Sequence, residues 1–325
     1  MRQEPKAVIE QISAAKRWVK RAQGKFSAYV FAQEVGIQDV QLRDQVLDEL
    51  VGRGILDRDE ARNGWYHRID AHPEPMDWQN AQVELAPVVL PLGLTDKAYI
   101  SPGNIIILAG ETNAGKTAFA LNVIYINLLH QGGAYERVRY LNSEMHPAEL
   151  KGRLLNIDRY PDAWEGLDAY SRTRDFHHVI DPHGLNVIDY LENLDNFYLI
   201  GNKIAQIHEA LDTGIALICL QKKRGELTAR GGDFTLEKAR LGLSMFYDGF
   251  VNYLHITKCK FPVAYPNPQG QEIDFSIADG GRSFDVRGAG WEWVTSEMRA
   301  SRTRTHENEA RLNALKGGGN KGFMA

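Results

Sequence analysis

Cysteine is scarce in this chain, long apolar runs are missing, and neither sign of charge is in large excess. The two cysteines, Cys219 and Cys259, lie in apolar stretches, which argues against a disulfide framework or a zinc site and predicts reduced, buried thiols. No run of about 18 apolar residues exists, and the N-terminus has no apolar signal core, so we expect a cytoplasmic protein without a membrane-spanning segment. The 38 Lys and Arg against 42 Asp and Glu give a net charge of -4, so contact with a nucleic acid requires a local basic patch.

What the chain does have is the composition of an ordinary globular protein. Of its 325 residues, 43% are hydrophobic and 25% are charged, which excludes a largely disordered or fibrous chain. At about 150 residues per domain, this length predicts two domains, or one large and one small.

Residues 1–70 are predicted to form a small helical domain. Apolar residues recur at helical spacing over residues 8–19, and two further helices are expected over residues 26–35 and 42–51. Two strand-like segments follow on either side of Asn63-Gly64, a dipeptide that favours a hairpin turn. Three helices and a hairpin resemble a winged helix-turn-helix domain.

The charges of this small domain leave its partner open. The first helix carries five cations around Trp18 with no acid between them, namely Lys16, Arg17, Lys20, Arg21 and Lys25, and such a patch can face phosphates. The third helix presents Arg43 and Arg53 among four acids, which makes a poor face for the major groove. DNA contact and docking of a protein partner are therefore both possible functions.

The rest of the chain is predicted to be an α/β domain between a linker and a tail. Residues 71–91 contain four prolines and no periodicity, as in a semi-extended linker. In residues 92–298 apolar runs alternate with helical stretches, which predicts a mainly parallel sheet with helices on its faces. Residues 299–325 are polar and basic and end in a glycine-rich stretch, so we expect a flexible tail.

A complete phosphate-binding loop motif occupies residues 110–117, with the sequence Gly-Glu-Thr-Asn-Ala-Gly-Lys-Thr. It follows the apolar strand 105–108 and opens a helical stretch, so backbone N–H groups and a helix N-terminus can surround phosphate oxygens. Lys116 is expected to reach the β- and γ-phosphates of ATP, and Thr117 to supply a hydroxyl to Mg²⁺. The predicted nucleotide-binding residues are Gly110, Glu111, Thr112, Asn113, Ala114, Gly115, Lys116, Thr117 and Ala118.

Two carboxylates stand at the ends of later strands. Asp189 ends the apolar strand 185–189, where a carboxylate can help to hold Mg²⁺ from the neighbouring strand; a strand-terminal Asp is otherwise a common turn former. Glu144 follows the strand 138–141 at the carboxyl end of the sheet, where it can polarise an attacking water. The alternative for Glu144 is an acid that stabilises the dipole of the helix after it.

Four segments together are similar to a known family: Pro102-Gly103 with the strand after it, the phosphate loop, the Ser143-Glu144-Met145 step, and residues 187–191. They resemble the ATPase core of DnaB-type replicative helicases, within the wider group of RecA-like P-loop ATPases. The resemblance covers residues 92–284 and does not extend to the first 90 residues. It implies a RecA-like P-loop fold.

The resemblance also implies roles for further residues. It makes Glu144 the catalytic base and Gln221 a sensor of the γ-phosphate that is coupled to a DNA-binding loop. That loop would contain Lys222, Lys223, Arg224, Arg230, Gly231 and Gly232, whose cations and N–H groups can follow a phosphodiester chain. It matches Lys258 and Lys260 to the Lys-x-Arg pair that reaches the γ-phosphate of a neighbouring subunit, with lysine in place of the arginine that would bridge two phosphate oxygens. The alternatives are a solvated loop and a solvated strand end.

These observations predict an ATP- and Mg²⁺-dependent motor on single-stranded DNA, a ring-forming helicase or translocase that works in replication or recombination. Its partners would be single-stranded DNA, further copies of the chain in a hexameric ring or filament, and a protein partner at the N-terminal domain. A recombination mediator or regulatory ATPase that assembles without unwinding is the main alternative. A DNA-binding regulator whose nucleotide only switches its oligomeric state is a third.

Overall fold

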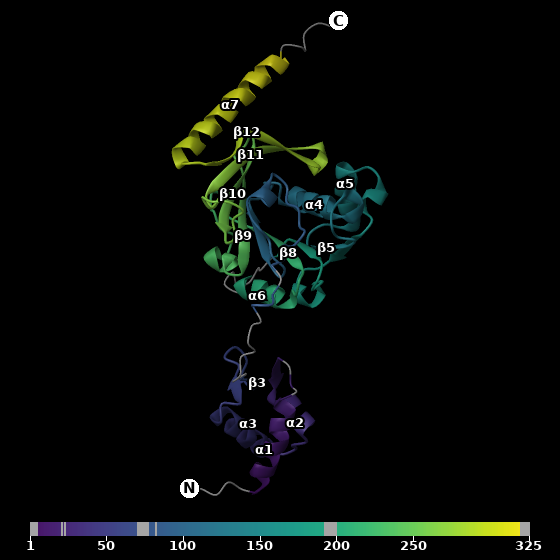
Figure 1. Ribbon diagram of the computed structural model, residues 1–325, viewed down its shortest axis with the longest axis vertical. Helices are drawn as coiled ribbons and strands as arrows, with labels where there is room; N and C mark the ends of the chain where they lie inside the picture. Colours follow the sequence, from purple (N-terminus) through teal and green to yellow (C-terminus); the bar gives the residue numbers. More distant parts are fainter. Residues whose placement is uncertain are drawn as a thin grey trace. The chain divides into compact units, whose positions relative to one another are not determined.

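We describe the protein from a computed structural model, which covers residues 6–20, 22, 24–69, 78–81, 83–191 and 200–318 (Figure 1). The chain divides into two compact units, Met1–Gln82 and Val83–Ala325. The division falls inside the predicted linker 71–91, of which residues 71–77 lie outside the described part. Among the described residues, no helix is long and apolar enough to cross a membrane.

In its described residues the smaller unit contains three helices and a three-stranded antiparallel sheet in the order β1-β3-β2. Its elements are α1 (Lys6–Val19), β1 (Lys25–Ser27), α2 (Ala28–Val35), α3 (Val40–Gly52), β2 (Leu56–Arg58) and β3 (Trp65–Arg68). The three predicted helices and the hairpin are present. The second helix begins at Ala28 and not at residue 26, because Phe26 pairs with Tyr66 in the sheet and the Ser27 hydroxyl caps the helix by accepting the Val30 N–H at 3.2 Å.

The larger unit is built on one nine-stranded sheet (Figure 1). Its strands are β4 (Ile105–Gly110), β5 (Val138–Asn142), β6 (Leu167–Ser171), β7 (Leu185–Asp189), β8 (Ile215–Gln221), β9 (Ala239–Tyr247), β10 (Asn252–Cys259), β11 (Gln271–Ala278) and β12 (Ser283–Trp293). Its α-helices are α4 (Lys116–Asn127), α5 (Pro147–Ile157), α6 (Ile200–Ala210) and α7 (Ser296–Gly318).

The strand order is β12-β11-β10-β9-β4-β8-β7-β5-β6. The six strands from β9 to β6 run parallel, and β10 to β12 extend the sheet as an antiparallel meander. The expected α/β fold with a mainly parallel sheet is therefore confirmed. The sequence analysis did not predict the antiparallel meander.

Strand β4 lies at the centre of two hydrophobic cores, because its side chains alternate between the faces of the sheet. Ile106 and Leu108 join the core that contains α4, and Ile105 and Ile107 join the core that contains α6. All four are fully buried. This burial on both sides fixes the end of β4, from which the phosphate loop starts. Both cysteines are free and buried, as predicted.

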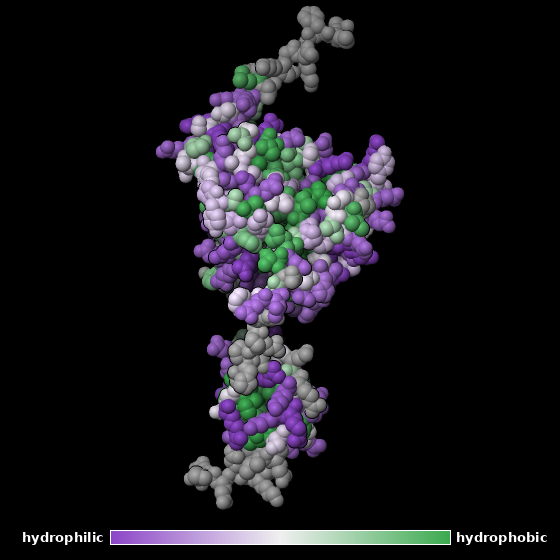
Figure 2. Space-filling model, viewed as in Figure 1, coloured by the Kyte–Doolittle hydropathy of each residue, from purple (hydrophilic) through white to green (hydrophobic). Residues whose placement is uncertain are grey.

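Two boundary predictions are wrong. The linker does not extend to residue 91, because Val88 and Leu90 are buried in the larger unit and the Asn127 side chain hydrogen-bonds both the N–H and the C=O of Val89, at 2.8 and 2.7 Å. The expected flexible tail is helix α7 up to residue 318, and residues 319–325 lie outside the described part. The surface of helix α7 is largely hydrophilic, whereas hydrophobic side chains gather in the middle of the drawn face of the larger unit (Figure 2).

Candidate nucleotide-binding site

The phosphate loop connects the buried end of β4 to the first turn of α4. Gly115 is the N-cap of α4, with a left-handed φ of 95°. Backbone N–H groups of a first helical turn point out of the N-terminus and carry partial positive charge. The loop therefore has the geometry that holds phosphate oxygens in the predicted setting of strand, loop and helix.

The two motif glycines leave space that neighbouring side chains occupy. A Cβ at Gly110 would lie 2.5 Å from Cγ of Lys116, and a Cβ at Gly115 would lie 2.3 Å from Cδ1 of Ile277 in β11. The loop is also tied to β10, since the Asn252 side chain donates a 2.9 Å hydrogen bond to the Ala114 carbonyl. The antiparallel meander thus supports the phosphate loop from the side opposite β8.

Lys116 folds back onto its own loop. Its ammonium donates to the carbonyls of Gly110, at 3.1 Å, and Glu111, at 2.8 Å. Burial lowers the pKa of Lys116, while the nearby carboxylates oppose this change. A phosphate placed in the loop would give this ammonium a charged acceptor that competes with the two neutral carbonyls.

Asp189 and Thr117 meet beside Lys116. Asp189 is 4% exposed, and its carboxylate accepts hydrogen bonds from the hydroxyls of Thr117 and, at 2.9 Å, Tyr140. Burial raises the pKa of this carboxyl, against the opposing effect of those hydrogen bonds. A buried carboxylate beside a hydroxyl is the oxygen donor set that suits Mg²⁺, so the residues present fit the predicted ion.

The route by which Asp189 reaches this position differs from the expectation. Strand β7 is not the neighbour of β4, because β8 lies between them. Cys219 of β8 accordingly lies next to Asp189 and hydrogen-bonds it, and burial raises the pKa of its thiol. Tyr140 was missed by the sequence analysis, because a tyrosine within an apolar strand gives no sign of the carboxylate it will face.

Glu144 is held at the mouth of the site by a turn after β5. The Asn142 side chain organises this turn, because its Oδ1 accepts the N–H of Glu144 at 3.1 Å and of Met145 at 3.0 Å, and its Nδ2 donates to the Met145 carbonyl at 2.6 Å. The turn leaves the Glu144 side chain exposed. An exposed carboxylate at this edge can contact water next to a bound phosphate.

Six of the nine predicted nucleotide residues, both carboxylates and Gln221 line one cavity of about 420 Å³, whereas Gly110, Glu111 and Ala114 do not line it. Its lining residues are Thr112, Asn113, Gly115, Lys116, Thr117, Ala118, Glu144, Arg153, Asp189, Tyr190 and Gln221. This volume lies in the range of small-molecule and cofactor sites, about 300 to 1,000 Å³. The sequence analysis assigned no role to Arg153, a residue of α5 that pairs with Glu149 at 2.9 Å, or to Tyr190.

The predicted DNA-binding loop follows Gln221 but differs from the expectation at Lys222. Lys222 is 4% exposed, and its ammonium lies 2.8 Å from the centre of the Phe246 ring. It is therefore a buried side chain, whose pKa is lowered to about 7 by burial, and not one of three adjacent exposed cations. Lys223, Arg224 and Arg230 are exposed, and the loop continues through Gly231 and Gly232 into the short helix Gly232–Leu236.

Lys258 and Lys260 do not line the cavity that holds Lys116. They line a separate, open depression of about 600 Å³ together with Asp233 and Glu237. The Lys258 ammonium donates to the Leu236 carbonyl and, at 3.4 Å, to that of Glu237. Lys260 is exposed. Any action of these lysines on a nucleotide would thus have to be on that of another copy.

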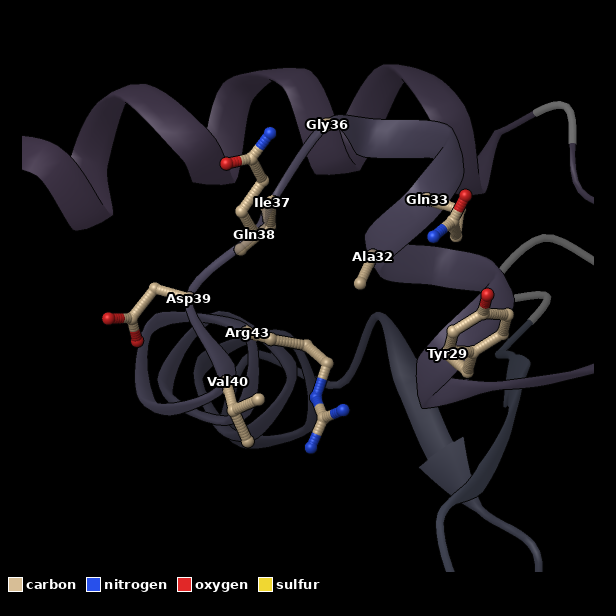
Figure 3. Close-up of a pocket in the computed structure, with 9 residues that line it drawn as sticks. All are labelled: Tyr29, Ala32, Gln33, Gly36, Ile37, Gln38, Asp39, Val40 and Arg43. Carbon is tan, nitrogen blue, oxygen red and sulfur yellow. The ribbon is translucent and has the colours of Figure 1, made fainter.

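The smaller unit has a surface cavity of its own at the turn between α2 and α3, of about 410 Å³. Figure 3 shows Val40 and Arg43 at the start of α3, with Tyr29 and Gln33 of α2 nearby. The acids that were predicted to make α3 a poor face for the major groove have partners within the unit. Asp39 caps α3, and other acids pair with arginines. These pairs are Arg43 with Asp44, Arg53 with Glu49, and Arg58 with Asp48.

Comparison with known proteins gives similarities in structure alone. No protein-family model and no curated protein matches the chain. A RadB recombinase structure is 14% identical with a TM-score of 0.43, covering 58% of this chain and 92% of that chain. A KaiC-like protein from the hyperthermophilic archaeon Pyrococcus horikoshii OT3 is 15% identical with a TM-score of 0.47, covering 64% of this chain and 100% of that chain. At these identities the similarity concerns the fold.

Proposed function

We propose that the protein is an Mg²⁺-dependent ATPase of the RecA-like P-loop type that acts on single-stranded DNA. The observation that carries the proposal is the convergence of Lys116, Asp189 and Glu144, from three separate strand ends, on one cavity. A phosphate loop alone would indicate nucleotide binding. The added exposed carboxylate gives the site a group that can act on water.

Each residue has a distinct task in this proposal. The loop N–H groups and Lys116 bind the phosphates, while Thr117 and Asp189 would hold Mg²⁺, which neutralises charge on the phosphates when bound. Glu144 orients the attacking water and accepts its proton, and Gln221 contacts the outermost phosphate from the end of β8. The exposed Lys223, Arg224 and Arg230 contact the phosphodiester chain without reading its sequence.

The test of the ATPase is Lys116→Ala. Removal of this ammonium should lower the rate of ATP hydrolysis by several orders of magnitude, because it neutralises charge that develops on the transferred phosphoryl group. Phosphate release with and without single-stranded DNA measures the rate, and circular dichroism checks the fold. Lys151→Ala, at an exposed position of α5, is the control and should hydrolyse ATP like the wild type. Equal turnover in both variants would refute the ATPase.

Two kinds of protein could use this hydrolysis. A helicase or translocase would use it to move along or unwind DNA, whereas a mediator would assemble on DNA without unwinding it. One observation favours the mediator, because Lys258 is engaged by carbonyls of its own chain and the arginine of the helicase pair is replaced by Lys260. Strand displacement on a forked duplex separates the two. Processive displacement supports the motor, while nucleotide-dependent binding without displacement supports the mediator.

A further inference from the structure

The phosphate loop and the basic loop after β8 are tied together through Glu111, the second residue of the phosphate-loop motif. The Glu111 side chain is 11% exposed, and its Oε1 accepts the N–H of Gly225 at 2.8 Å. Gly225 lies between Arg224 and Glu226 in the basic loop. A second contact joins the loops at their base, where the N–H of Lys222 donates to the Gly110 carbonyl at 3.2 Å.

The two residues that hold the basic loop are also the two that hold the Lys116 ammonium. Lys116 donates to the carbonyls of Gly110 and Glu111. Phosphate in the loop competes for the same ammonium, since a charged partner is preferred over neutral carbonyls. Binding of a nucleotide therefore changes the hydrogen bonding of the residues on which the basic loop rests.

The buried Lys222 side chain fixes the start of the basic loop. Its ammonium lies 3.9 Å from Oε1 of Glu111, donates to the Glu226 carbonyl at 2.7 Å and packs over Phe246. Phe246 stacks on Tyr253 with ring centres 4.5 Å apart, and Arg299 of α7 lies 3.8 Å from the Tyr253 ring. Because Lys222 is buried in this stack, movement of the loop has to begin at Lys223.

We propose that Glu111 is a positioning residue that couples nucleotide binding to the mobility of the basic loop 223–230, with its carboxylate as the latch on the Gly225 N–H. The inference rests on the proposed ATPase and adds a contact separate from Gln221. In the structure the latch is closed, with the Glu111 carboxylate on the Gly225 N–H. When Lys116 turns to the phosphates, Glu111 loses the partner of its carbonyl, and the basic loop is released toward DNA.

Hydrogen exchange read by mass spectrometry tests the latch first without nucleotide. In Glu111→Ala the Gly225 amide should exchange about tenfold faster than in the wild type, because it loses a charged acceptor. Glu111→Gln keeps an acceptor oxygen and should restore most of the protection. Glu226→Gln removes another carboxylate of the same loop while keeping the backbone carbonyl that accepts from Lys222, and its Gly225 amide should exchange like that of the wild type. Equal Gly225 exchange in Glu111→Ala and the wild type would overturn the inference.

The coupling is then measured at a saturating concentration of a non-hydrolysable ATP analogue with Mg²⁺, with its affinity for each variant determined by calorimetry. In the wild type and in Glu226→Gln the analogue should speed exchange over residues 223–230. In Glu111→Ala exchange should already be fast and should not change further. A wild type that binds the analogue with no change in this loop defeats the coupling. A wild type that shows no binding in calorimetry defeats the proposed ATPase and the coupling together, while Gly225 exchange still reports on the latch.

Discussion

At the scale of single residues, Asp189 is the carboxylate whose burial most clearly opposes its charged form. This carboxylate is buried next to Tyr140, Thr117 and Cys219, and its pKa is raised by burial. A group that is costly to keep charged in the free protein is commonly found where function requires it. The cost falls when a cation or Lys116 faces the carboxylate, so nucleotide binding with Mg²⁺ should relieve it.

Asp189→Asn should therefore stabilise the nucleotide-free protein while removing the Mg²⁺-dependent part of nucleotide binding. Because the folded-state pKa lies above the unfolded value, the contribution of Asp189 to stability is fully present below pH about 4 and is lost as the pH rises through the folded-state pKa. We expect the melting temperature of the variant to exceed that of the wild type by about 3 °C near pH 7, and the difference to shrink toward pH 5.

Asp158→Asn is the control with the opposite sign. Hydrogen bonds from the Tyr160 N–H, at 3.0 Å, and the Tyr125 hydroxyl, at 2.8 Å, lower the pKa of Asp158. Its contribution to stability is therefore present near neutral pH, and the variant should melt below the wild type there. Melting curves from pH 5 to 8, with nucleotide affinity in Mg²⁺ and in EDTA, decide the matter. A lower melting temperature for Asp189→Asn at pH 7 would contradict the argument.

At the scale of elements, the sequence predicted what local patterns determine. The strand 105–108, the phosphate loop and the helix after it are contiguous, so motif and periodicity define them together. Asp189 and Glu144 could be placed near the loop because the carboxyl ends of parallel strands share one edge of a sheet. The position of β8 between β4 and β7 could not be predicted, since strand order depends on packing between segments distant in the chain.

Helix α7 was missed for a related reason. Its sequence is almost wholly polar, so it has no apolar stripe that would mark a packed helix. It is attached by charge, since Arg299 pairs with Glu272 and, at 2.7 Å, with Asp274, while Arg302 contacts Glu292. These acceptors belong to β11 and β12, and their register is not readable from a single sequence.

The anchoring of α7 can be tested with two arginines of the same helix. Arg299→Ala should lower the free energy of unfolding of the larger unit by about 3 kcal/mol, because it leaves the buried carboxylates of Glu272 and Asp274 without this partner. Arg311→Ala removes a pair with Glu307 whose arginine side chain is 72% exposed, and should change stability by less than about 0.5 kcal/mol. Urea denaturation measures both. Similar small effects would show that α7 is not held by these ion pairs.

At the scale of the whole molecule, the nucleotide cavity and the lysine depression form separate parts of the larger unit. The cavity contains the phosphate loop, both carboxylates and Gln221, while the depression contains Lys258 and Lys260. Within one chain these lysines have no access to the phosphates they were predicted to contact. If they act in hydrolysis, they act between copies, and the ring or filament predicted from the sequence is then required for full activity.

Mixing two impaired variants tests this shared site. Lys260→Ala should reduce hydrolysis only in the assembled protein, because its ammonium is proposed to contact a neighbour's nucleotide. In mixtures with Lys116→Ala, some interfaces combine an intact Lys116 site with an intact Lys260, and turnover should partly recover there. An arginine in this role contributes about a thousandfold or more to the rate, and a lysine should contribute less because it contacts one phosphate oxygen at a time.

Light scattering has to show that mixed assemblies form, so that a lack of recovery can be read as a result. Lys238→Ala, at an exposed position outside both cavities, serves as the matched control and should hydrolyse ATP like the wild type at every protein concentration. Mixed assemblies without recovered turnover, or a Lys260→Ala variant that follows this control at all concentrations, would mean that Lys260 is a solvated strand end. Of the two lysines, Lys260 is the one tested because it is exposed, whereas Lys258 is held by carbonyls of its own chain.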